Sequence, residues 1–257
     1  MKENKIKDLV LNLLSTFEYA GSIALDLRKK GLIKKIKKDN TPVTNGDIEV
    51  NNILTKKILE LTPKISIVSE ETIDNKTNQD LKNFWLIDPI DGTNDYVNNR
   101  DEFTLNAALI LDKQPAAGII YAADKGRMFY SFGPTNSFEI SNGKKIKLIE
   151  KKNMHPNEIK AVSYSDKLKE AILNKHKQYK VDNYIKMKSS LKFCVVAAGE
   201  YDLYVAEPRA CEWDIAAGHA ILEHAGGKVT DFEGNKIYYG KKDFKNPSLI
   251  LKGKNIS

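Results

Sequence analysis

The chain has 257 residues, of which 41% are hydrophobic and 29% are charged. This composition is ordinary for a globular protein and excludes wholesale disorder, and the length is enough to bury a core without a disulfide or metal staple. The 41 lysines and arginines exceed the 34 aspartates and glutamates, which gives a formal net charge of +7. Taken alone, this charge favours a nucleic acid or an anionic surface as a partner.

The sequence also indicates where the protein works. Its two cysteines, Cys194 and Cys211, are too few for a disulfide framework, which favours a reduced intracellular compartment. We see no signal peptide at the N-terminus and no window of about 18 uncharged apolar residues, the length that spans a membrane. We therefore expect a cytoplasmic protein. The lysine-flanked first helix leaves peripheral contact with the inner membrane as an alternative.

In chain order, apolar residues at helical spacing predict a first helix over 5–30, ended by Gly31. A lysine-rich loop follows over 34–38, and a second helix is predicted from about 46 to 61. Short apolar runs bounded by turn residues predict strands at 65–68, 84–87, 103–111, 116–121 and 127–132. We interpret this half as a meandering antiparallel sheet behind two helices.

After about residue 150, strands and helices alternate. The predicted strands are 159–163, 184–187, 201–205 and 228–230, and the predicted helices are 166–176, 190–198 and 213–225. This alternation favours an α/β layer. We expect a layered α/β fold in one compact unit, with an N-terminal part over 1–150 and a C-terminal part over 151–257 that share one core or a tight cleft.

Two carboxylates follow an apolar strand in Trp85-Leu-Ile-Asp88-Pro-Ile-Asp91-Gly-Thr93. Pro89 removes a backbone donor from the strand, and Gly92 permits a sharp turn. Carboxylates held at a strand end suit a hard divalent cation such as magnesium, and the carbonyl of Ile90 is a further candidate ligand. The alternative is an ordinary turn in which both aspartates only cap and solvate the loop.

Two other acidic segments lie where an apolar element begins or ends. Glu70 and Glu71 come just past a short strand, and Asp214 begins an apolar helix after Trp213. Each has a structural alternative: a polar loop for the glutamates, and a helix cap for Asp214. Because three such groups occur together, we favour a metal cluster.

A fourth acidic residue, Asp47, has two interpretations. Thr44 and Asp47 have the spacing of a capping box at the start of the second helix. Alternatively, Asp47 pairs with the hydroxyl of Thr93 and orients a metal-bound water for attack.

These segments resemble a known enzyme superfamily. The motifs are Thr41-Pro-Val-Thr-Asn-Gly-Asp47, Ser69-Glu-Glu-Thr72, Asp88-Pro-Ile-Asp-Gly-Thr93 with Arg100-Asp-Glu-Phe-Thr-Leu-Asn-Ala-Ala-Leu-Ile110, and Trp213-Asp-Ile-Ala-Ala-Gly-His-Ala220. In this order they resemble the lithium-sensitive, magnesium-dependent phosphomonoesterases that include inositol monophosphatase. The run Ser189-Ser-Leu-Lys-Phe-Cys194 favours the bacterial 3′(2′),5′-bisphosphate nucleotidase branch, which acts on adenosine 3′,5′-bisphosphate.

The resemblance implies an αβαβα sandwich, two or three Mg²⁺ ions and a small phosphorylated substrate. It implies that one ion is held by Glu70, Asp88 and the Ile90 carbonyl, a second by Asp88, Asp91 and Asp214, and a weaker third by Glu70. It assigns Asp47 and Thr93 to activation of the attacking water. It adds contacts to the substrate from Gly92, Thr93, Ser190 and Lys192, besides the metal ligands, and suggests a homodimer.

The chain departs from the nucleotidase branch at two positions. An acid, Asp166, stands where the branch usually has a histidine, and Ala206 stands where it usually has an arginine, with Arg209 as the nearest candidate. Both changes affect recognition of the substrate rather than the metal site. An inositol-1-monophosphatase or a broader sugar-phosphate phosphatase is therefore the alternative. We expect no nucleic-acid partner, because the lysines are dispersed and no aromatic stacking surface accompanies them.

Overall fold

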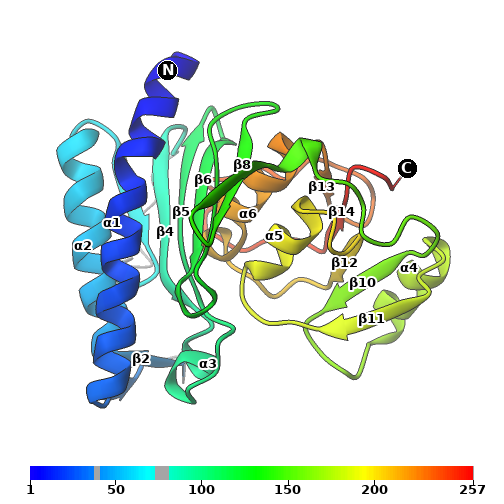
Figure 1. Ribbon diagram of the computed structural model, residues 1–257, viewed down its shortest axis with the longest axis horizontal. Coiled ribbons are helices and arrows are strands. Elements are labelled where there is room, and N and C mark those ends of the chain that lie inside the picture. Colours follow the sequence, from blue (N-terminus) through cyan, green and yellow to red (C-terminus); the bar gives the residue numbers. More distant parts are fainter. Residues whose placement is uncertain (38–40, 73–80, 257) are drawn as a thin grey trace.

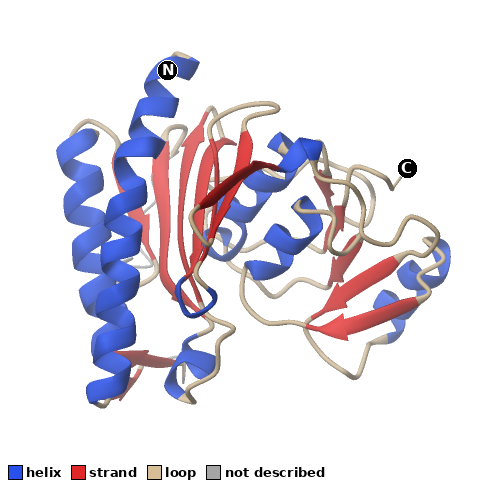
Figure 2. Cartoon of the chain, in the orientation of Figure 1, coloured by secondary structure: helices blue, strands red, loops and turns tan. Residues whose placement is uncertain are grey.

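The computed structural model describes residues 1–37, 41–72 and 81–256, so Lys38 of the predicted loop lies outside the described residues. A pair of helices, a large sheet, a second pair of helices, a smaller sheet and a last helix follow one another across the molecule (Figures 1 and 2). The predicted αβαβα sandwich is confirmed.

The first layer consists of α1 (Glu3–Lys30) and α2 (Asn45–Leu61). The apolar stripe of α1 is fully buried at Leu13 and Phe17. The predicted loop between the helices contains a short hairpin, in which β1 (Lys34–Ile36) pairs antiparallel with β2 (Pro42–Thr44). All three residues of β1 are exposed, so this strand carries no alternating apolar pattern that would have predicted it.

The large sheet has seven strands in chain order. They are β3 (Ser66–Ser69), β4 (Phe84–Asp91), β5 (Thr104–Leu111), β6 (Gln114–Ala122), β7 (Arg127–Ser131), β8 (Ser137–Ser141) and β9 (Lys144–Lys147). Only the β3–β4 pair is parallel; the other neighbours are antiparallel. The sequence reading missed β8 and β9. Their signal is the Asn142–Gly143 turn, where both residues have positive φ, as two-residue hairpins require.

Both faces of this sheet are covered, and its strands alternate between two cores. Trp85, Ile87 and Ile119 face α1 and α2, whereas Phe84, Leu86 and Ile120 face the helices α5 (Leu191–Ala197) and α6 (Glu212–His224). A strand that is buried on both faces has a nearly continuous apolar sequence, which is why β4, β5 and β6 lack alternating polar residues.

The small sheet has the order β11-β10-β12-β14-β13. Its strands are β10 (Lys160–Ser163), β11 (Asn183–Lys186), β12 (Leu203–Ala206), β13 (Lys228–Thr230) and β14 (Leu249–Lys252), and α4 (Glu170–Gln178) contacts it. β10 runs parallel to β11 and β12, whereas β14, which was not predicted, lies antiparallel between β12 and β13. In the described part of the chain, no helix has the length and apolarity to cross a membrane.

Three short helices complete the described structure: α3 (Thr93–Val97), η1 (Ala123–Lys125) and η2 (Leu148–Glu150).

The longer helix α6 packs between the two sheets. α6 lies so close to β6 that a Cβ on Gly118 would be 2.3 Å from the carbonyl oxygen of Ala217. Only glycine allows this approach, which places the start of α6 beside the large sheet.

His224, at the end of α6, makes folding pH-dependent. Its Nδ1 accepts a hydrogen bond from the Gly133 N–H at 3.2 Å, so this nitrogen must stay unprotonated. Burial lowers the pKa of His224 to about 4; Glu223 opposes this shift and His219 adds to it. Since the unfolded chain binds this proton more readily, the neutral form contributes about 2–3 kcal/mol near neutral pH, and this is lost as pH falls from about 6.5 to 4.

We therefore expect the difference in unfolding free energy between the wild-type chain and His224→Gln, measured by urea denaturation, to shrink as pH falls over this range. His155→Gln removes an imidazole elsewhere and is the control. The same pH dependence in His224→Gln as in the wild type would contradict this account.

Candidate active site

The end of β4 brings Asp88 and Asp91 to the edge of the large sheet. The pairing of β4 with β5 shifts register between these two residues, at the place where Pro89 has no N–H to donate. Gly92 then turns the chain into α3 with φ 93°, and a Cβ there would lie 2.8 Å from the Glu102 carbonyl oxygen. Any other residue at position 92 would be strained and would displace the turn.

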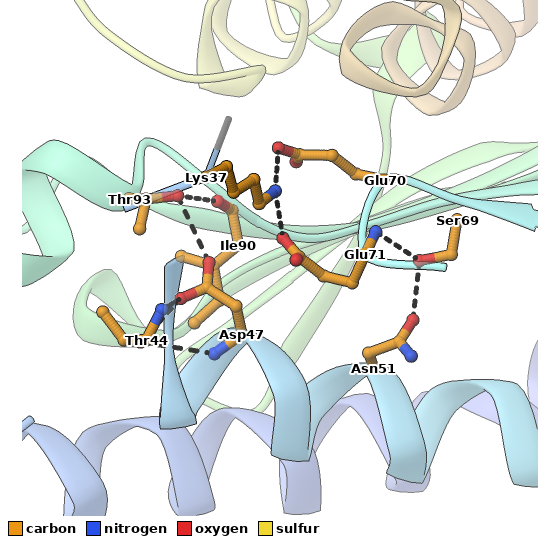
Figure 3. Close-up of polar contacts among 9 residues, drawn as sticks. All are labelled: Lys37, Thr44, Asp47, Asn51, Ser69, Glu70, Glu71, Ile90 and Thr93. Atoms are coloured by element: carbon orange, nitrogen blue, oxygen red, sulfur yellow. Dashed lines mark hydrogen bonds and ion pairs between the residues drawn. The ribbon is translucent and has the colours of Figure 1, made fainter. Parts of the chain in front are cut away.

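Parallel pairing brings Glu70 to the same edge, because the carboxyl ends of parallel strands lie together. Its N–H donates to the Ile87 carbonyl at 3.1 Å. Ser69, just before it, donates to Asn51 on α2 at 2.6 Å, which anchors the segment. Lys37 pairs with Glu70 at 2.9 Å and with Glu71 at 2.7 Å (Figure 3).

Asp47 makes both of the side-chain contacts predicted for it. Its Oδ2 accepts from the N–H and the hydroxyl of Thr44, at 2.7 and 2.6 Å, which is the capping box of α2. The Thr93 hydroxyl lies 3.2 Å from Asp47 Oδ1 and 3.0 Å from the Ile90 carbonyl oxygen (Figure 3). The two interpretations are therefore compatible, since each uses a different carboxylate oxygen.

Asp214 comes from the C-terminal part of the chain, in the first turn of α6. Its Oδ2 accepts from the Cys211 N–H at 2.7 Å, so it also caps a helix. The neighbouring Trp213 packs against Phe244, with ring centroids 5.9 Å apart. The other carboxylate oxygen of Asp214 has no role in this cap and is available to the cavity that Asp214 lines.

One cavity of about 300 Å³ collects these groups. Its lining includes every predicted metal ligand together with Gly92 and Thr93, namely Glu70, Asp88, Ile90, Asp91, Gly92, Thr93 and Asp214. Within residues 1–37, 41–72 and 81–256, no three His, Cys, Asp or Glu side chains are already drawn together closely enough to hold a metal ion. Two of the acids have other partners: Glu70 is turned to Lys37, and Asp214 bonds to Cys211.

Asp88 is buried, Asp91 and Asp214 are half-buried, and the carboxylates repel one another. Burial is the main reason why the pKa of Asp88 lies well above its usual value, and the charges of the neighbouring acids add to the shift. Burial also raises the pKa of Asp91 to about 6 and that of Asp214 to about 8. One oxygen of Asp88, Oδ1, is buried and has no hydrogen-bond partner among the described residues. This pocket is therefore prepared for a positive group.

Comparison with known proteins identifies the family. Residues 10–255 match the inositol monophosphatase family. The chain belongs to this family.

Individual members give the same result. The chain is 31% identical to the 3′(2′),5′-bisphosphate nucleotidase CysQ of Aggregatibacter actinomycetemcomitans, over 95% of this chain and 92% of that protein. The crystal structure of CysQ from Bacteroides thetaiotaomicron superposes with a TM-score of 0.77 at 26% identity and covers 96% of both chains. An IMPase/NADP phosphatase crystallised with Mg²⁺ and phosphate, at 18% identity, shares the fold with a TM-score of 0.78 over 99% of this chain and 92% of that one. The protein is thus an enzyme, a phosphatase of the inositol monophosphatase family.

Ser190 and Lys192, predicted to contact substrate, lie at the start of α5 on the border of this family site. The Ser190 hydroxyl is buried, 2.8 Å from the Thr104 hydroxyl and 2.6 Å from Asn106 Oδ1. Lys192 donates to the Ser189 carbonyl, and burial lowers its pKa to about 8 despite the opposing charge of Asp91. Both residues line a smaller cavity that also reaches Asp91. Their substrate contacts stay predictions.

Three residues that were not predicted from the sequence also line the cleft. We call Tyr164, Lys188 and Arg209 the cationic wall; all three line the same cavity as the carboxylates. Each follows the end of one of three parallel strands, β10, β11 and β12. Arg209 was noted only as the arginine nearest to Ala206, and neither Tyr164 nor Lys188 was predicted as a site residue, so only the sheet topology brings the three together.

The capping role of Asp47 can be tested separately from its chemistry. Asp47→Ala removes both bonds from Thr44, so we expect the free energy of unfolding to fall by about 1 kcal/mol. Thr44→Ser keeps the hydroxyl and backbone donor and is the matched control. Urea denaturation measures both variants. Unchanged stability in Asp47→Ala would show that the capping box contributes nothing.

Proposed function

We propose that this phosphatase is a Mg²⁺-dependent 3′(2′),5′-bisphosphate nucleotidase of the cytoplasm, which hydrolyses adenosine 3′,5′-bisphosphate to AMP and phosphate by direct attack of water. The observation that carries the proposal is one cavity lined by all five proposed ligand residues: Glu70 just after β3, Asp88, Ile90 and Asp91 of β4, and Asp214 of α6. The names of the most similar relatives support the choice of substrate.

The residues present fit magnesium. All the candidate ligands are oxygen atoms, the type that Mg²⁺ prefers, and Asp88 Oδ1 is buried without a partner. Glu70, Asp88 and the Ile90 carbonyl would hold one ion, and Asp88, Asp91 and Asp214 a second, with Glu70 as the base of a weaker third. Bound there, Mg²⁺ would lower the pKa of a water molecule and neutralise charge on the phosphate.

Asp47 and Thr93 would orient the attacking water. When the Thr93 hydroxyl donates a hydrogen bond to Asp47 Oδ1, a lone pair of the threonine oxygen is left to accept a hydrogen bond from water. The cap supplied by Thr44 keeps the other oxygen of Asp47 engaged, so the carboxylate cannot rotate away. Burial raises the pKa of Asp47, which makes this carboxylate a better proton acceptor through the threonine.

The substrate would be held from both sides of the cleft. The backbone N–H groups of Gly92 and Thr93 are proposed to meet the phosphate under attack, beside Glu70, Ile90, Asp91 and Asp214. Ser190 and Lys192 are proposed to contact the remainder of the nucleotide from α5. A panel of adenosine 3′,5′-bisphosphate and inositol 1-phosphate, with released phosphate as the readout, tests this assignment. Preference for inositol 1-phosphate would replace it with the alternative activity.

The ligand assignment predicts the effect of removing one charge. Asp91→Asn or Asp214→Asn should lower kcat by about 100-fold or more, because two acids are needed to place the second ion, while the fold persists since neither change alters side-chain size. Phosphate release measures turnover, and circular dichroism measures folding. Asp182→Asn, on the exposed surface, is the matched control. A metal-independent, fully active Asp91→Asn enzyme would disprove the site.

Removal of the metal should weaken substrate binding as well as turnover. Four clustered carboxylates repel a bisphosphate unless cations are present, so we expect the dissociation constant in EDTA to rise by about 100-fold or more. Isothermal titration calorimetry of an inactive Asp47→Asn variant, with and without Mg²⁺, avoids hydrolysis during the measurement. Equal affinity in both conditions would contradict the electrostatic account.

A further inference from the structure

The cationic wall stands at one edge of the small sheet. Tyr164 comes one residue after β10, Lys188 two residues after β11 and Arg209 three residues after β12. Because these three strands are parallel, their carboxyl ends lie together and point toward the cleft between the two sheets. The wall therefore forms part of the same cavity as Asp91 and Asp214, although it belongs to a different layer of the fold.

The ring of Tyr164 gathers the two cations. The guanidinium carbon of Arg209 lies 3.4 Å from the ring centroid, and Lys188 Nζ lies 3.6 Å from it. The charges of Lys188 and Arg209 also act on the phenol of Tyr164, and the charge of Arg209 acts in addition on the phenol of Tyr204. Burial alone would raise the pKa of Tyr164, but the two cations outweigh it and lower the pKa. The positive charges are thus held in place by aromatic side chains.

Neither cation forms an ion pair with a carboxylate in the described part of the chain. In the described residues, Lys188 and Arg209 have no carboxylate within ion-pair distance, whereas Lys169 and Lys186 at the same edge pair with Glu207 and Asp166. Holding two like charges against one ring costs free energy, and among the described residues Asp91 and Asp214 act on Arg209 only from beyond ion-pair distance. A site of this kind is suited to an anion from solution, and a guanidinium matches the geometry of a phosphate.

We propose that Arg209 and Lys188, held on Tyr164, bind a second phosphate of the substrate and so make the enzyme prefer bisphosphorylated over monophosphorylated nucleotides. The inference rests on the proposed function, in which the first phosphate is cleaved at the carboxylates. In this proposal, Arg209 supplies the positive charge that the nucleotidase branch usually has at the position of Ala206. Ala206, Arg209 and Lys192 line the same small cavity. It also explains why Asp166 is tolerated, since Lys186 pairs with it at 2.7 Å.

The test compares two substrates of the full-length chain with Mg²⁺: adenosine 3′,5′-bisphosphate and adenosine 3′-monophosphate. We expect Arg209→Gln and Lys188→Gln each to raise KM for the bisphosphate about tenfold or more, the size of one lost charge-assisted bond, with kcat within twofold. For the monophosphate, both constants should stay within twofold. Arg209→Lys, which keeps the charge, should recover part of the loss.

Lys177→Gln removes one positive charge from the exposed surface of α4, outside the cavity linings at the cleft, and is the control for general electrostatic attraction. Equal changes for both substrates in Arg209→Gln, or no change, or a tenfold effect in Lys177→Gln, would overturn the inference. If the wild-type chain releases phosphate from neither nucleotide, the proposed function fails instead. In that case the dissociation constants of the two nucleotides, compared between the wild type, Arg209→Gln and Lys188→Gln, decide the inference, because no hydrolysis disturbs the binding measurement.

Discussion

The structure depends on holding several carboxylates together in a buried place where they repel one another. No single element could do this, since each acid needs a rigid backbone behind it. β4 supplies two of them through a register shift and a left-handed turn at Gly92. Parallel pairing with β3 adds Glu70, and the close contact of α6 with Gly118 adds Asp214. The cost of this arrangement appears as the raised pKa values of Asp88, Asp91 and Asp214.

Two side chains that cap helices, Asp47 and Asp214, are also the ones proposed to take part in the chemistry. In Asp47 and in Asp214, one carboxylate oxygen accepts a hydrogen bond at the N-terminus of a helix, which fixes the direction of the second carboxylate oxygen. A carboxylate held this way needs little reorganisation when it acts, which is the usual basis of electrostatic preorganisation. The capping alternatives considered for these acids are therefore part of how the site is built, and do not compete with a catalytic role.

The positive net charge has a different meaning in three dimensions. Many lysines are scattered over the surface and can attract a small polyanion from a distance, an effect that salt weakens. At the cleft, the acids Glu70, Asp88, Asp91 and Asp214 come from the ends of β3 and β4 and from α6, whereas Lys188 and Arg209 follow strands of the small sheet. A ligand with two negative groups matches this division, provided that cations cover the acids.

The sequence by itself determined the layered fold, the helix pair, most strands of the large sheet and the acidic motifs, because these depend on apolar periodicity and on short segments with fixed turn chemistry. It did not reveal β1, β2, β8, β9 or β14, which are all short, although the Asn142–Gly143 turn was an available signal for the β8–β9 hairpin. Only the tertiary structure decided that Asp47 bonds to both Thr44 and Thr93, that Lys37 pairs with Glu70, and that Tyr164, Lys188 and Arg209 share one wall. These contacts join residues from separate elements, and their distances follow from strand order and helix packing, which no local pattern records.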